Sequence, residues 1–174
     1  MSNKDTPTKA TKTRKLRTLP RFLYFAYGAN TNVAAMARRC PLAKPYGKMM
    51  LRDHRLSFHG VADVQEAKGR TVFGALWWIT PQCERSLDAF EGFPTLYVKQ
   101  YGKVMLADGT EHVVMFYVMK NPGFPAPPYS TYEDTLRTGY NEFNLPAEQI
   151  DLAISEGPPV RHVFTDPAEL WETA

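Results

Sequence analysis

One glutamate at a predicted helix end is the first residue whose type and position suit chemistry. Glu91 lies in the segment LDAFEG, directly before Gly92, which is a typical signal for the end of a helix. A carboxylate at the C-terminal end of a helix is disfavoured by the helix dipole, and partial burial raises its pKa further. Such a group suits a general base, but most glutamates are solvated surface residues, and both interpretations stay open at this point.

A glycine turn is the second such feature, and it follows the apolar segment FLYFA at 22–26. The aromatic run predicts a strand buried on both faces. Gly28 then allows a sharp turn, and NVAAMARR predicts a short helix after it. Backbone N–H groups at a strand-to-helix turn point outward and suit a carboxylate or a developing oxyanion, although most such turns bind nothing.

Further strands are expected to support these two features. TVFGALWWIT predicts a second apolar strand, and YVKQYGKVML and EHVVMFYVM, joined by Asp108 and Gly109, predict a β-hairpin. The polar stretch 63–70, which contains Gly69, predicts a loop.

Two helices are expected to carry candidate site residues. Thr80 and Pro81 predict the start of the helix that ends at Glu91, with Leu87 and Phe90 on its core-facing side. A later helix beginning near residue 131 carries Tyr132, which as a lone tyrosine is more often a packing residue than a ligand contact.

Length and composition predict a single domain at 19–174, preceded by a basic segment at 1–18. The 174 residues suffice to bury one core. The first 18 residues hold six basic residues against one acidic residue, whereas the rest hold 15 against 17. Because the basic segment has almost no large apolar residue, we expect it to be disordered. Such a segment can bind nucleic acid, but a solvated tail is the commoner case, and we favour it.

Other features narrow the class of protein. No apolar run approaches the roughly 18 residues of a membrane span, so no membrane partner is expected. Cys40 and Cys83 show no ligand spacing and the four histidines form no HxH or HExxH pattern, so no metal is predicted. Unpaired cysteines and the lack of an apolar secretory segment predict a cytoplasmic protein. The sequence indicates no oligomeric state.

Three separated motifs together resemble the γ-glutamylcyclotransferase family. YFAYGAN resembles its Tyr-Gly-Ser-Asn turn, and LDAFEGFPTLYVKQ resembles its Leu-Asp-x-x-Glu-Gly segment with a following tyrosine. PPYSTYEDTLRTGYNEFNLP resembles its Pro-rich loop, tyrosine and helix, and the order of the motifs also agrees. The resemblance implies an α+β fold, a small mixed β-barrel flanked by short helices, with a cavity near the YGAN turn.

The resemblance also implies intramolecular aminolysis without a cofactor. The α-amine of a small γ-glutamyl amino acid or amine attacks the substrate's own γ-carbonyl, which closes 5-oxoproline and expels the leaving amine. Glu91 matches the family's catalytic glutamate and is expected to act as general acid and base. The substrate carboxylate or oxyanion is expected to meet the backbone N–H groups of Tyr27, Gly28, Ala29 and Asn30.

Two matched positions qualify this expectation. Tyr132 matches a substrate-contacting tyrosine of the family. Ala29 stands where the family usually has serine, so activity or affinity falls if the serine hydroxyl is needed and is kept if the backbone acts instead. The γ-glutamyl substrate stays open, and the alternative function is a non-catalytic small-molecule-binding or interaction protein that keeps the fold.

Overall fold

The computed structural model describes residues 20–106 and 109–157. The basic segment 1–18 lies outside the described residues, and so does 158–174, so the predicted tail and domain bounds stay predictions. The elements in chain order are β1 (Phe22–Ala26), η1 (Ala29–Thr31), α1 (Val33–Arg39), β2 (Lys44–Phe58), β3 (Ala62–Ile79), α2 (Pro81–Glu91), β4 (Tyr97–Met105), β5 (Glu111–Met119), α3 (Ser130–Glu142) and α4 (Glu148–Ser155).

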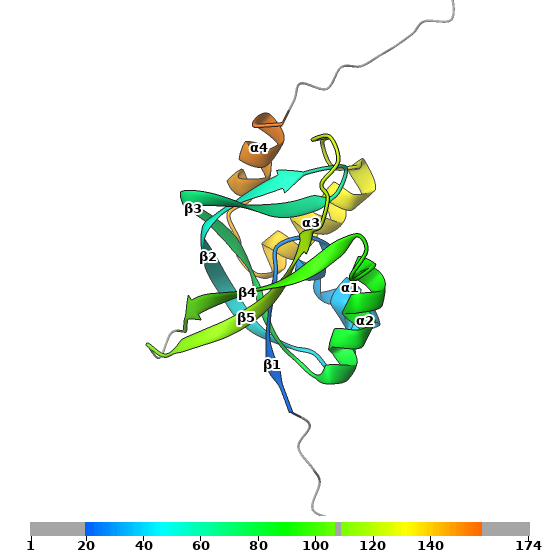
Figure 1. Ribbon diagram of the computed structural model, residues 1–174, viewed down its shortest axis with the longest axis vertical. Coiled ribbons are helices and arrows are strands. Elements are labelled where there is room, and N and C mark those ends of the chain that lie inside the picture. Colours follow the sequence, from blue (N-terminus) through cyan, green and yellow to red (C-terminus); the bar gives the residue numbers. More distant parts are fainter. Residues whose placement is uncertain (1–19, 107–108, 158–174) are drawn as a thin grey trace, which may run out of the picture.

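A five-stranded mixed sheet in the order β2-β3-β1-β5-β4 organises the molecule (Figure 1). The central strand β1 runs antiparallel to β3 and parallel to β5. The two remaining pairs, β2 with β3 and β4 with β5, are antiparallel. Leu23 to Ala26 are all buried, and because successive side chains alternate between faces, β1 is covered on both sides as predicted.

The sheet curls strongly but does not close. In the described chain its outer strands, β2 and β4, are not hydrogen-bonded neighbours. They nevertheless approach closely, since a Cβ on Gly102 of β4 would lie 3.0 Å from Cδ1 of Leu51 in β2. The α+β class and the mixed sheet are confirmed, and the word barrel applies only in a loose sense.

The predicted loop at 63–70 is wrong, because these residues belong to the long strand β3. Residues 65–70 are mostly exposed where β2 and β3 extend together, so their polarity reflects solvent contact and not the absence of a strand. A bulge between Arg52 and His54 marks the bend in this hairpin. There the Asp53 carboxylate accepts a 2.8 Å hydrogen bond from the Gly69 N–H.

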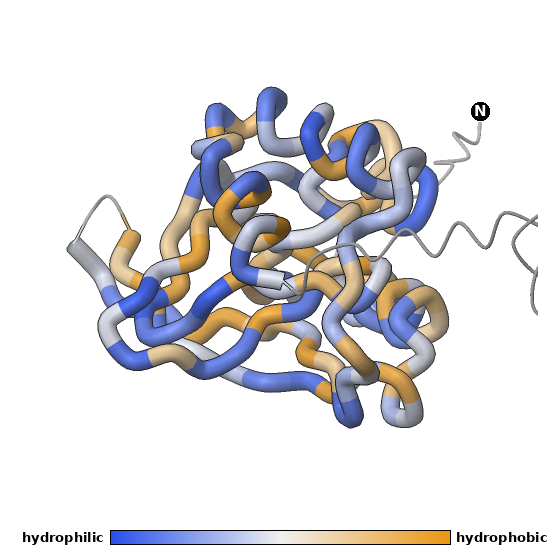
Figure 2. Tube along the Cα trace, turned by 90° about the horizontal axis from the view of Figure 1, so that it is seen from above, coloured by the Kyte–Doolittle hydropathy of each residue, from blue (hydrophilic) through white to orange (hydrophobic). Residues whose placement is uncertain are grey.

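The core joins residues from every strand and every α-helix, and hydrophobic stretches of these elements meet inside the fold (Figure 2). Met36 of α1, Leu87 of α2, Leu136 of α3 and Ile150 of α4 are each fully buried. None of the helices that the structure describes is long and apolar enough to cross a membrane.

Local signals set both ends of α2, the helix that carries Glu91. The Thr80 side chain accepts a 3.3 Å hydrogen bond from the Cys83 N–H, and Pro81 occupies the first turn. Gly92 ends the helix in the left-handed conformation at φ 62. Both predicted boundaries are therefore confirmed.

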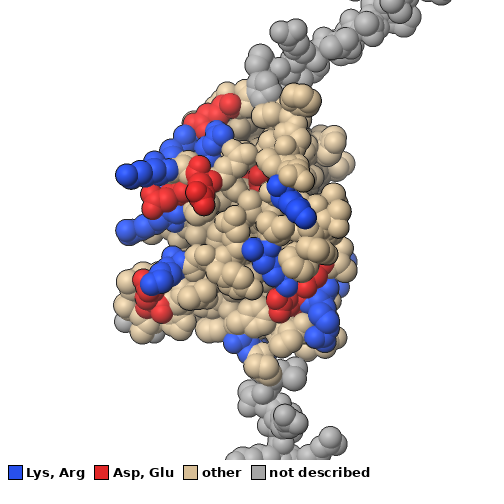
Figure 3. Space-filling model, in the orientation of Figure 1, with Lys and Arg blue, Asp and Glu red and all other residues tan. Residues whose placement is uncertain are grey.

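Charged side chains of opposite sign are interspersed on the face shown in Figure 3. Across the described surface, ion pairs include Glu156 with Arg70 at 2.9 Å and Asp151 with Arg137 at 2.6 Å. Exposed pairs of this kind contribute little to stability, on the order of 1 kcal/mol or less. This face therefore presents no broad patch of a single sign.

Candidate active site

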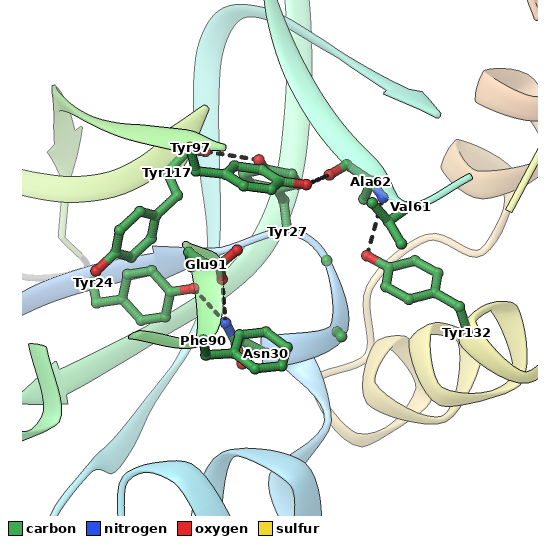
Figure 4. Close-up of a pocket in the computed structure, with 12 residues that line it drawn as sticks. Tyr24, Tyr27, Asn30, Val61, Ala62, Phe90, Glu91, Tyr97, Tyr117 and Tyr132 are labelled. Atoms are coloured by element: carbon green, nitrogen blue, oxygen red, sulfur yellow. Dashed lines mark hydrogen bonds between the residues drawn. The ribbon is translucent and has the colours of Figure 1, made fainter. Parts of the chain in front are cut away.

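A cavity of about 190 Å³ opens beside the YGAN turn (Figure 4). A cavity of this size suits a small ligand. All six predicted site residues line it, namely Tyr27, Gly28, Ala29, Asn30, Glu91 and Tyr132. The lining residues that sequence reasoning missed are Tyr24, Val61, Ala62, Phe90, Tyr97 and Tyr117.

Glu91 reaches the cavity because it continues the buried face of α2. Cys83 and Leu87 are 2% and 0% exposed, and a further step of four residues along the helix leads to Glu91. The prediction that Phe90 faces the core with Leu87 is wrong, because Phe90 is 48% exposed. Phe90 lies beside the buried face and contributes to the cavity wall instead.

Burial raises the pKa of the Glu91 carboxyl from 4.5 to about 7. The guanidinium of Arg39 and a hydrogen bond from Asn30 oppose this effect without cancelling it. Glu91 is also the only charged side chain among the described residues that line the cavity. A carboxyl with a pKa near neutrality can both accept and return a proton at physiological pH.

The side chain of Asn30 links Glu91 to another lining residue, Tyr24. Its Nδ2 donates 2.9 Å hydrogen bonds to Oε1 of Glu91 and to the hydroxyl of Tyr24 (Figure 4). Its Oδ1 accepts a 2.8 Å hydrogen bond from Nη1 of Arg39. The sequence did not place the Asn30 side chain beside Glu91, because no local pattern reveals which distant side chains an asparagine will meet.

The YGAN turn is held by contacts on both sides. The Tyr27 hydroxyl donates a 2.7 Å hydrogen bond to the carbonyl oxygen of Tyr117. The Thr31 N–H and hydroxyl both donate to the Gly28 carbonyl, at 2.9 and 2.8 Å. A Cβ on Gly28 would lie 2.8 Å from the Tyr132 hydroxyl, so this close approach requires glycine.

Two tyrosine hydroxyls form hydrogen bonds with the backbone of Ala62 at the start of β3. The Ala62 N–H donates to the Tyr132 hydroxyl at 3.1 Å, and the Tyr97 hydroxyl donates to the Ala62 carbonyl at 2.9 Å. The Tyr132 ring also packs against the hydrophobic core. Tyr132 thus packs against the core and lines the cavity, and its contact with a substrate stays a prediction.

The cavity hydroxyls stay neutral over the physiological range. Burial raises the pKa of Tyr132 to about 12, and it also raises the pKa values of the other lining tyrosines, Tyr24, Tyr27, Tyr97 and Tyr117. Across 20–106 and 109–157, no group of three or more His, Cys, Asp or Glu side chains could hold a metal ion. The cavity therefore offers one titratable carboxyl, several neutral phenol groups and the backbone of a turn.

Comparison with known proteins assigns the chain to a family. Residues 24–139 match the sequence model of the family described as gamma-glutamyl cyclotransferase, AIG2-like. The γ-glutamylcyclotransferases of Homo sapiens and Bos taurus are each 31% identical over 140 residues, which cover 73% of this chain and 74% of theirs.

Solved structures agree with the sequence comparison. A structure described as gamma-glutamyl cyclotransferase superposes with a TM-score of 0.70 at 27% identity and covers 86% of this chain and 96% of its own. A Homo sapiens protein described as uncharacterized superposes with a TM-score of 0.69 at 28% identity over the same shares. The chain therefore belongs to the γ-glutamyl cyclotransferase, AIG2-like family of enzymes.

Proposed function

We propose that this enzyme releases 5-oxoproline from a γ-glutamyl amino acid or γ-glutamyl amine, with Glu91 as general acid and base. The observation that supports this most directly is the Glu91 carboxyl, whose pKa lies near 7 at the wall of a small cavity. The names of the relatives point to the same chemistry.

The substrate supplies its own nucleophile, so the protein has only to bend it and move protons. Binding the γ-glutamyl chain with its α-nitrogen against the γ-carbonyl makes the attack intramolecular, which lowers its entropic barrier. The ionised Glu91 attracts the substrate's α-ammonium group, because no other charged side chain lines the cavity in the described chain.

Proton transfer through Glu91 balances the reaction. The carboxylate takes one proton from the α-ammonium, and the resulting amine attacks the γ-carbonyl carbon to close the five-membered ring. Protonated Glu91 then gives its proton to the leaving nitrogen as the C–N bond breaks. The extra proton on the ring nitrogen passes to Glu91 and departs with the expelled amine, which leaves as an ammonium ion.

The YGAN turn is the proposed binding site for the negatively charged groups of the substrate and of the transition state. Backbone N–H groups of Tyr27, Gly28, Ala29 and Asn30 are the candidates to bind the substrate carboxylate or the oxyanion. Ala29 lines the cavity, and its methyl side chain has no hydrogen-bond donor, so any hydrogen bond it gives an anion comes from its backbone. Tyr132 completes this side of the cavity through its ring and hydroxyl.

Wild type and Glu91→Gln test the proposal with a panel of γ-glutamyl amino acids and γ-glutamyl amines, by measuring 5-oxoproline. Wild type is expected to release 5-oxoproline from at least one of these two classes of compound. Glu91→Gln is expected to lose this activity while still binding the same compound. Binding without turnover by both proteins would instead favour the non-catalytic alternative.

Glu84→Gln is the matched control. Glu84 lies on the same helix, pairs with Lys99 at 2.6 Å, and does not line the cavity. Its substitution removes the same charge from α2 and is expected to leave turnover within about twofold of wild type. Equal activity in wild type and a folded Glu91→Gln protein would contradict the assignment of Glu91.

A further inference from the structure

We propose that Arg39 is a positioning residue for this reaction, which fixes the Asn30 amide so that its NH2 group and not its oxygen faces Glu91. The inference rests on the proposed function. It concerns the last residue of α1, which belongs to neither the YGAN turn nor the helix that carries Glu91.

Hydrogen-bond chemistry determines the orientation of the Asn30 amide. An arginine guanidinium has only donors, so its contact at 2.8 Å must be with Oδ1 of Asn30. The two N–H groups of the amide then point to Oε1 of Glu91 and the hydroxyl of Tyr24, each at 2.9 Å. All the groups of the amide are thus used, and they are used in one orientation.

The reversed amide would favour the wrong state of the base. With Oδ1 turned toward Glu91, an ionised carboxylate would face another acceptor, whereas a protonated carboxyl could donate to it. Arg39 blocks this reversal because its guanidinium would then face the donor NH2 group. It therefore favours the ionised form of Glu91 by orienting Asn30 as well as by its own charge.

Arg39 is itself held away from the substrate. Its Cζ lies 3.6 Å from the centre of the Phe90 ring, an arrangement that stabilises a cation on an aromatic face. Phe90 lines the cavity, but Arg39 does not. Arg39 therefore acts on Glu91 through Asn30 and through its own charge, and not by binding the substrate.

The remaining ionisable groups around Glu91 leave Arg39 as its main charged neighbour. Tyr24 of β1, Tyr27 of the turn, Tyr97 of β4, Tyr117 of β5 and Tyr132 of α3 face the cavity, and burial raises the pKa of each. Among the described residues, Arg39 is the only charged group that shifts the pKa of Glu91.

The test is a pH titration of the Glu91 carboxyl by NMR, with glutamate labelled at its side-chain carboxyl carbon and the signal assigned from Glu91→Gln. Arg39→Met keeps the apolar stem and removes the charge and the donors. In this variant the midpoint of the Glu91 titration is expected to rise by about one pH unit, because the nearby opposite charge and the fixed orientation of the Asn30 amide are both lost. Arg39→Lys keeps the charge and is expected to recover part of this shift.

Arg38→Met is the matched control, because Arg38 is the exposed neighbour on the same helix and does not line the cavity. In this variant the midpoint of the Glu91 titration is expected to stay within about 0.2 of a pH unit of wild type, since exposed charges are screened. An unchanged midpoint in Arg39→Met, or an equal rise in Arg38→Met, would overturn the proposal. The titration needs no substrate, so it can fail or succeed independently of the proposed function.

Turnover gives the second readout once a substrate is known. If the midpoint moves from about 7 to about 8, the ionised fraction at pH 7 falls from about one half to about one tenth, and kcat is expected to fall about fivefold. KM is expected to stay within about twofold, because Arg39 does not touch the cavity. A large rise in KM at unchanged kcat would show instead that Arg39 binds the substrate.

Discussion

Helix α2 carries acidic side chains in two contrasting settings. Glu84 and Asp88 both pair with Lys99, at 2.6 and 2.8 Å, and neither lines the cavity. Glu91, three residues further, meets an amide and aromatic rings, and burial raises its pKa to about 7. Glu84 and Asp88 thus contact their cation directly, whereas the Asn30 amide lies between Glu91 and Arg39. The same helix therefore holds acids for structure and an acid for chemistry.

The largest expected difference between the two settings is in turnover, when Glu91→Gln is compared with Glu84→Gln. The amide side chain fills the same space but cannot accept and return a proton, and general acid–base catalysis contributes about 100-fold to 10,000-fold. We expect kcat for 5-oxoproline release to fall by at least about 100-fold, while Glu84→Gln changes it little. The measurement is steady-state turnover of both variants, with circular dichroism to verify folding.

The pH dependence of kcat/KM sharpens the comparison next. Since Glu91 must be ionised to take the first proton, kcat/KM is expected to fall about tenfold per pH unit below a midpoint near 7. A midpoint near 4.5, the ordinary value for this group, would show that Glu91 is not the base or is not buried in the working enzyme.

The same shifted pKa predicts a stability effect that needs no substrate. Between pH 4.5 and about 7 the folded protein holds a proton on Glu91 that the unfolded chain has released. The contribution of Glu91 to the free energy of unfolding therefore decreases as the pH rises through this window. Urea unfolding at pH 5 and pH 8 is expected to show Glu91→Gln gaining stability relative to wild type at the higher pH.

Lys99→Met is expected to affect the structural setting alone. The lysine loses its contacts with Glu84 and Asp88, and Asp88 keeps its 2.7 Å hydrogen bond from the Tyr117 hydroxyl. We expect the free energy of unfolding to fall by about 1–2 kcal/mol, measured by urea denaturation. Turnover is expected to stay within about twofold of wild type. A tenfold loss of kcat in the folded variant would show that the two settings on α2 are coupled.

The sequence predicts where the helix and strand of this site begin and end, but not the contacts between distant segments. Thr80, Gly92 and the aromatic run of β1 act locally, so their patterns predict where α2 and β1 begin and end. The four-residue steps from Cys83 to Leu87 to Glu91 also lie within one helix, and following them would have placed Glu91 and not Phe90 on the buried face.

Other features depend on segments that meet only in the folded chain. The bonds of Asn30 to Glu91 and Arg39 join η1, α2 and α1, and no spacing within any one of these elements encodes them. The stretch 63–70 is polar because its hairpin extends into solvent, and its pairing with β2 is equally invisible in its own composition. Features set by local sequence could therefore be predicted, whereas features set by tertiary contacts could not.

Ala29→Ser tests the YGAN turn, the other part of the cavity wall, and is expected to have the smallest effect. If the turn binds anions through its backbone, an added hydroxyl leaves the N–H groups in place, and kcat and KM are expected to stay within about threefold of wild type. Ala29→Val is the paired variant, because it fills part of a cavity of about 190 Å³ without adding a donor, and we expect it to raise KM. A tenfold gain in kcat/KM for Ala29→Ser would mean that the hydroxyl contributes about 1.4 kcal/mol to transition-state binding. The turn would then act partly through a side chain that this protein lacks, and not through its backbone alone.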